Sequence, residues 1–260
     1  MSVEYPARGR CGASSVSNRR LLVVGNSHTQ MIQDAAGTRA KLGQPLGDIE
    51  VCWLISRGKG DFGNTSREDA LAKIQSLGSS DLLALTLLGT LHNMIGLFKH
   101  DTPFTLVEPA GGPIAPPAGS EVIPMNQMRE LFQDHVQSNQ LFKSLVDAAP
   151  CPVLHFFPPP PKEFFAASGK SRVIDGRPVR LEYAAAPSRV ALWKLEAAIA
   201  SAYLAGLSVH HYSMPEGSAT RDGFLAPAHH AKDATHANSA YGELLLRDFE
   251  HMLHHPPVDP

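Results

Sequence analysis

Short apolar runs alternate with longer amphipathic segments along most of the chain. The apolar runs lack the polar alternation of half-exposed strands, which is typical of parallel strands buried on both faces. They predict strands at residues 21–24, 49–55, 82–88, 152–157 and 207–211. The segments between them predict helices at residues 29–41, 66–77, 126–148, 188–204 and 238–253. This alternation predicts a three-layer α/β/α domain around a five-stranded, mostly parallel sheet.

Other parts of the chain have no readable periodicity. Residues 99–124 are rich in proline and glycine, so we expect a long loop that covers one edge of the sheet. Residues 162–186 predict an irregular excursion with a short helix at 163–167. We expect a flexible tail at 1–18, a single domain at 19–254 and a second tail at 255–260.

Polar and glycine-rich stretches follow the predicted strands. In a parallel sheet the carboxyl ends of the strands meet at one edge, where ligands bind. Ser27, residues 58–60, residues 89–93 and Pro158 all come just after a predicted strand. We therefore expect them to gather at that edge, with His28 and His92 shaping the pocket.

The parts of a hydrolytic triad stand at opposite ends of this domain. Serine attacks poorly at neutral pH unless a base takes its proton. Ser27 follows the first strand, and His236 is the candidate base, with Asp233 placed to hold its ring. A serine at a strand-to-helix turn is also a common helix cap, and Asp-x-x-His is common in loops. Their joint occurrence at these topological positions favours the triad.

This combination resembles the SGNH hydrolase superfamily, the GDSL-type esterases and lipases. Residues 25–28, Gly-Asn-Ser-His, stand where the family has its Gly-Asp-Ser motif, with Asn26 in place of the acid. The best match is the last motif, in which Asp233 and His236 precede the final helix. The resemblance covers roughly residues 20–246 and implies a flavodoxin-like strand order, with Ser27 as nucleophile, His236 as base and Asp233 as the triad acid.

The oxyanion-binding motifs of the family match less well. The resemblance implies a donor amide at Gly60, with Gly58 as the alternative. In the third motif either Thr90 or Asn93 replaces the usual oxyanion asparagine, depending on which residue fills the glycine position. Loss of one oxyanion donor typically costs ~2.7–4 kcal/mol of transition-state stabilisation.

The implied activity is hydrolysis of a carboxylic ester, including an acetyl ester, through an acyl-serine intermediate that needs no cofactor. Two alternatives stay open: acyl transfer to a sugar or other alcohol by the same triad, and a catalytically weak SGNH-like domain used for binding. The identity of the acyl and alcohol groups, and the oligomeric state, are not readable from the sequence.

Composition and net charge limit the classes of partner and the cellular location that we expect. The formal net charge of −2 gives no electrostatic reason to expect a nucleic acid or an anionic membrane. The apolar runs are too short to span a bilayer, and the first residues do not read as a secretory signal. Thirteen histidines and three cysteines show no metal-ligand spacing, so we expect no metal. We therefore expect a cytoplasmic protein that acts on a small-molecule ester.

Overall fold

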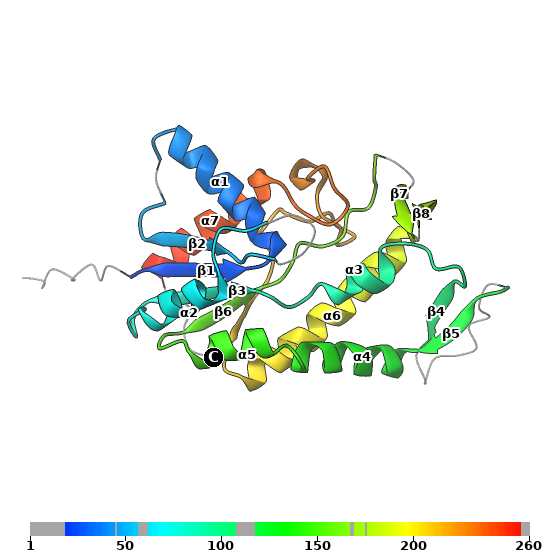
Figure 1. The fold of residues 1–260 in the computed structure, drawn as a ribbon, viewed down its shortest axis with the longest axis horizontal. Coiled ribbons are helices and arrows are strands. Elements are labelled where there is room, and N and C mark those ends of the chain that lie inside the picture. The colour runs from blue at the N-terminus through cyan, green and yellow to red at the C-terminus, as the bar shows by residue number, and fades with distance from the viewer. Residues whose placement is uncertain are drawn as a thin grey trace, which may run out of the picture.

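Five parallel strands form the central sheet of the computed structural model, which describes residues 19–44, 46–56, 62–107, 118–166, 169–174 and 176–255 (Figure 1). The spatial order is β2-β1-β3-β6-β9. Counted along the chain within this sheet, the order is 2-1-3-4-5, which confirms the predicted flavodoxin-like arrangement. The strands are β1 (Leu21–Gly25), β2 (Ile49–Trp53), β3 (Leu82–Thr86), β6 (Val153–Phe156) and β9 (His210–Tyr212).

Helices cover both faces of this sheet, as the sequence predicts. Leu21 and Val23 of β1 belong to a buried cluster with the helices on one face, α1 (Gln30–Lys41) and α7 (Ser239–His254). Leu22 and Val24 point into the opposite cluster. That second cluster also takes apolar side chains from α2 (Arg67–Gln75), α4 (Met125–Gln137), α5 (Gln140–Asp147) and α6 (Ala186–Gly206).

The predicted long helix at 126–148 is wrong, because the chain breaks between α4 and α5. Asn139 caps the second helix, since its side-chain oxygen accepts a hydrogen bond from the amide of Phe142 at 3.0 Å. An asparagine that bonds a nearby amide competes with continued helix, and the amphipathic pattern on either side hides this local choice. A further short helix, α3 (Leu91–Gly96), is too brief to give a periodic signal.

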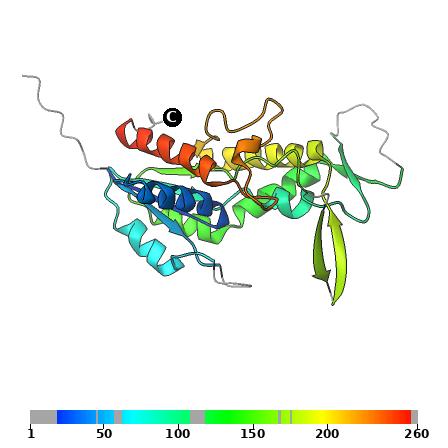
Figure 2. The ribbon, with the colours of Figure 1, turned by 90° about the horizontal axis from the view of Figure 1, so that it is seen from above.

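The two segments expected to be irregular contain small sheets. Strands β4 (Phe104–Val107) and β5 (Glu121–Pro124) pair in parallel within the expected loop. Strands β7 (Gly169–Ile174) and β8 (Arg177–Glu182) form an antiparallel hairpin, and residues 163–166 are not helical. Figure 2 shows this hairpin projecting from the body. In β8 the half-buried Val179 and Leu181 alternate with exposed residues, but a pattern of only two apolar positions is too short to predict the hairpin by itself.

The first and last α-helices of the described chain, α1 and α7, pack closely against each other. A Cβ added to Gly242 of α7 would lie 2.0 Å from the carbonyl oxygen of Met31, so only glycine allows this approach. Arg39 near the end of α1 pairs with Glu243 at 2.8 Å and also with Glu250. Because Met31 meets Gly242 and Arg39 meets Glu250, the two helices run in the same direction. Both helix N-termini therefore lie at the carboxyl edge of the sheet (Figure 1).

The glycine at 242 gives a direct test of this packing. We expect Gly242→Ala to lower the free energy of unfolding by ~1–3 kcal/mol, because the added methyl group forces the helices apart. Gly37→Ala in α1 is the matched control, since nothing lies within 4 Å of the added carbon. The control is expected to raise stability by ~0.5–1 kcal/mol through helix propensity. Urea unfolding of both variants measures the difference, and equal effects would contradict the packing.

Candidate active site

Ser27 begins a 3₁₀ turn, η1 (Ser27–Thr29), which one residue, Asn26, separates from the end of β1. The side-chain oxygen of Asn26 accepts a hydrogen bond from the amide of His28 at 3.3 Å, so Asn26 is the residue that caps this turn. The capping role that the sequence leaves open for Ser27 is thus filled by its neighbour. Ser27 itself is exposed, and its hydroxyl is available to a ligand.

Asp233 and His236 lie on one loop that ends at the N-terminus of α7. One carboxylate oxygen of Asp233 accepts the amides of Thr235 and His236, each at 2.8 Å. The other oxygen lies 3.0 Å from Nδ1 of His236. Because an ionised carboxylate only accepts, Nδ1 carries the ring proton and Nε2 keeps its lone pair. The local fold therefore prepares the imidazole as a base.

The same contacts set the charge of Asp233. Burial alone would raise the pKa of this carboxyl group. The hydrogen bonds from the His236 ring, the His236 amide and the Thr235 amide outweigh burial, and the pKa lies well below its ordinary value. Asp233 is therefore ionised at neutral pH and can stabilise a positive charge on the imidazole.

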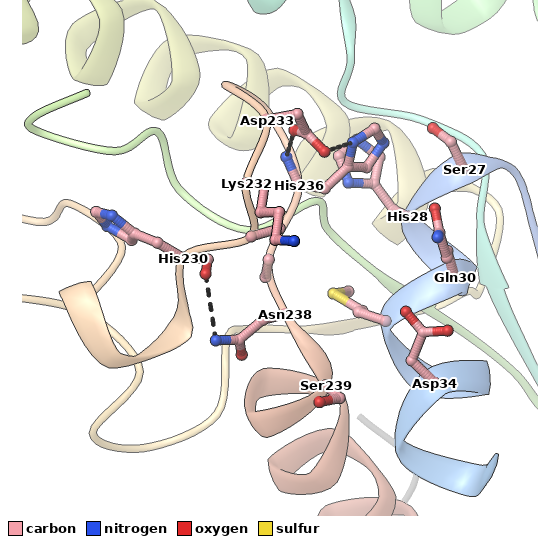
Figure 3. Close-up of a pocket in the computed structure, with 13 residues that line it drawn as sticks. Ser27, His28, Gln30, Asp34, His230, Lys232, Asp233, His236, Asn238 and Ser239 are labelled. Atoms are coloured by element: carbon pink, nitrogen blue, oxygen red, sulfur yellow. Dashed lines mark hydrogen bonds and ion pairs between the residues drawn. The ribbon is translucent and has the colours of Figure 1, made fainter. Parts of the chain in front are cut away.

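Residues 27–34 and residues 230–239, which are far apart in the sequence, meet at a cavity of about 470 Å³. Ser27, Asp233 and His236 all line it, and Figure 3 shows the Ser27 hydroxyl on the side of the cavity where the imidazole rings lie. Among the described residues no hydrogen bond joins Ser27 to His236, and such bonds are often loose without substrate. The other lining residues are His28, Gln30, Met31, Asp34, His230, Ala231, Lys232, Ala237, Asn238 and Ser239.

His28 is a buried neutral imidazole beside the candidate base. Its ring centroid lies 4.8 Å from that of His236. Burial lowers the pKa of His28 to about 3, the charges of protonated His236 and His92 act in the same direction, and Asp233 opposes them. His28 therefore adds no second positive charge when His236 takes up a proton.

The candidate oxyanion donors are not gathered around Ser27 in the same way. Gly58 and Gly60 lie outside the described residues. Thr90 precedes α3 and Asn93 lies within it; both are half-buried, and neither lines the cavity with Ser27. Gly89 has φ of +90° and packs on the Phe157 ring, so position 89 requires glycine. The oxyanion roles of Gly60, Thr90 and Asn93 stay predictions.

Two buried charged residues near the site escape sequence reasoning. Glu196 of α6 accepts the amides of Leu91 and His92 at 3.0 and 2.9 Å, and the His92 ring at 2.8 Å. It thereby holds the start of α3 at the carboxyl edge of the sheet. Lys162, after β6, donates to carbonyl oxygens of the Asp233 loop. The only signal in the sequence is a charge within an apolar or proline-rich run, which is a weak one.

A second cavity of about 570 Å³ lies against the same loop. Its lining is more apolar and includes Leu97, Phe98 and Tyr183, with the two aromatic rings stacked 5.2 Å apart. Asp233 and His236 line both cavities. Within the described ranges no group of three or more His, Cys, Asp or Glu residues could hold a metal ion, and no helix has the length and apolar character to cross a bilayer.

Comparisons with known proteins give structural likenesses only. No protein-family model matches the chain, and no curated protein matches it. Similar solved structures include a carbohydrate acetylesterase family member from Sinorhizobium meliloti, at 14% identity and a TM-score of 0.46, covering 91% of this chain and 98% of that one. The periplasmic domain of a lipopolysaccharide acetyltransferase from Salmonella ser. Paratyphi A is similar at 10% identity and a TM-score of 0.45. The match covers 92% of this chain and 85% of that one. A GDSL-like lipase from Bacteroides thetaiotaomicron is similar at 13% identity and a TM-score of 0.41. The match covers 92% of this chain and 90% of that one.

Proposed function

We propose that the chain is an SGNH-type serine hydrolase that cleaves a carboxylic ester, an acetyl ester included, through an acyl-serine intermediate. The observation that carries this proposal is the Asp233–His236 pair, joined at 3.0 Å, on the wall of a cavity that Ser27 also lines. A helix-capping role for Ser27 would not explain this arrangement, because Asn26 caps the turn.

In the first half of the reaction, Ser27 Oγ attacks the ester carbonyl carbon while Nε2 of His236 takes the hydroxyl proton. The carbon–oxygen bond to the alcohol then breaks, and the alcohol leaves with that proton. In the second half, water attacks the acyl-serine with His236 again as the base. The carboxylic acid leaves and the Ser27 hydroxyl is restored.

Asp233 keeps the proton on Nδ1 and stabilises the imidazolium that forms in each half. The developing oxyanion is bound by the Ser27 amide and the Gly60 amide, together with Thr90 or Asn93. The neutral ring of His28 packs on His236 without opposing its charge. No cofactor takes part in this scheme.

A fluorophosphonate probe tests the nucleophile directly. Ser27 Oγ attacks phosphorus and displaces fluoride, so we expect a single covalent adduct that peptide mass spectrometry places on Ser27. Ser27→Ala is expected to give no adduct. His236→Ala is expected to label about 100-fold more slowly or worse, because the general base is lost.

Ser239→Ala is the matched control, since this serine lines the same cavity at the start of α7. It should label like the wild type. A folded wild-type protein that forms no adduct would favour the binding-domain alternative and reject the hydrolase. For a labelled enzyme, the partition of an acyl donor between water and added alcohols separates hydrolysis from acyl transfer.

The rate of labelling should depend on one proton. The neutral imidazole of His236 is required, so the rate should fall ~10-fold for each pH unit on the acid limb. Asp233, whose pKa is lowered, stays ionised in this range, and His28, with its pKa lowered to about 3, stays neutral. This dependence is measured from labelling rates between about pH 4.5 and 8.5. A flat profile would mean that no imidazole acts as base.

A further inference from the structure

Lys162 is a buried cation directly behind the candidate triad. It follows β6 and the buried prolines at 158–161, and it pairs with Leu225 in an isolated parallel bridge. Only 3% of its surface is exposed. Burial lowers the pKa of its ammonium group, and the Asp233 charge partly opposes this shift. Among the described residues it forms no salt bridge, although burial of an unpaired charge is costly.

The ammonium group donates hydrogen bonds to two carbonyl oxygens of the Asp233 loop. Lys162 Nζ donates to the carbonyl of Ala231 at 2.7 Å and to the carbonyl of Asp233. Hydrogen bonds from a charged donor are shorter and stronger than neutral ones. The contact therefore fixes the backbone of the residue whose side chain holds His236.

The loop between His230 and Ala237 is otherwise held mainly at its two ends. His230 and Ala237 form a bridge there, and the Asn238 side chain donates to the carbonyl of Ala228 at 2.8 Å. At the tip, the hydrogen bonds described for the Asp233 side chain are made within the loop itself. Within the described part of the chain, the hydrogen bonds that attach residues 231–233 to another element come from Lys162.

A second buried cation holds Lys162 in turn. Arg189 of α6 donates to the carbonyl of Lys162 at 2.6 Å and to that of Glu163 at 2.9 Å. Its guanidinium carbon lies 4.5 Å from the centre of the Phe165 ring. The two cations thus form a series in which α6 fixes the backbone of Lys162, and Lys162 fixes the backbone of Asp233.

We propose that Lys162 is a positioning residue that aims the Asp233–His236 pair at Ser27 through the Ala231 and Asp233 carbonyls. This inference rests on the proposed hydrolase function. Lys162 touches neither the substrate nor a reacting atom in this scheme. Its effect is on the geometry of the base, and it should therefore alter the chemical step rather than the binding of a probe.

The test compares Lys162→Met with wild type by two readouts. The first is nitrogen NMR of the histidine rings, with the His236 signal assigned by its loss in His236→Gln. We expect the wild-type ring in a single tautomer with the proton on Nδ1, and a mixture of tautomers in Lys162→Met. The second is fluorophosphonate labelling, in which the maximal rate should fall about 10- to 100-fold with little change in probe affinity, because the base is misaligned.

Lys162→Arg keeps the charge and the donors, so it should recover most of the rate and the single tautomer. Lys194→Met, at an exposed lysine of α6, is the control for loss of a lysine and should behave as wild type. If Lys162→Met does not fold, Lys162→Gln, which keeps one amide donor, carries the same test. An unchanged tautomer and an unchanged maximal rate in the folded variant would overturn the proposal.

The two proposals fail in different ways. A wild-type protein that does not label rejects the hydrolase, while the NMR readout still reports whether Lys162 holds the ring. A wild-type protein that labels, with a Lys162→Met variant that is unchanged in both readouts, rejects only the positioning role.

Discussion

The contact between Gly242 of α7 and the backbone of Met31 in α1 is the constraint on which the site depends. It lets two parallel helices approach until a side chain at position 242 would collide with a carbonyl oxygen. Ser27 stands just before α1, and His236 just before α7. Because both helices begin at the carboxyl edge of the sheet, their packing brings residues from opposite ends of the chain to one cavity. Arg39, near the end of α1, also joins the two helices through ion pairs with Glu243 and Glu250 of α7.

Away from the contact between α1 and α7, buried charged side chains hold irregular segments in place. Glu196 holds the start of α3 by its amides, and Lys162 holds the Asp233 loop by its carbonyls. A carboxylate is suited to the unsatisfied amides at a helix start, and an ammonium group to the carbonyls of an irregular loop. In each case one buried charge replaces contacts that a surface loop would otherwise make with water. The loops at this edge of the sheet are irregular, and these contacts hold them in one conformation.

Sequence reasoning succeeds where one local pattern decides the structure. The buried strands follow from apolar runs between amphipathic segments, and the strand order follows from the resemblance of the motifs to a known family. It fails where an interaction is long-range or the pattern is weak. A charge within an apolar or proline-rich run is only a weak local sign that Lys162 and Glu196 are buried. In the hairpin at 169–182 the alternation is limited to Val179 and Leu181, and one asparagine splits the predicted long helix. The Asp233–His236 contact is readable from spacing, but its placement beside Ser27 requires the fold. The cytoplasmic location and the oxyanion donors stay predictions of the sequence.

A crystal structure of the unliganded protein near neutral pH, at a resolution that places side-chain atoms, tests the central claim most directly. The deciding quantity is the separation of Ser27 Oγ from Nε2 of His236. The account predicts about 2.6–3.2 Å, or a single water molecule bridging the two atoms. It also predicts that Nδ1 of the same ring still faces the Asp233 carboxylate. A ring whose Nε2 points away from Ser27, at a distance that one water molecule does not span, would contradict it.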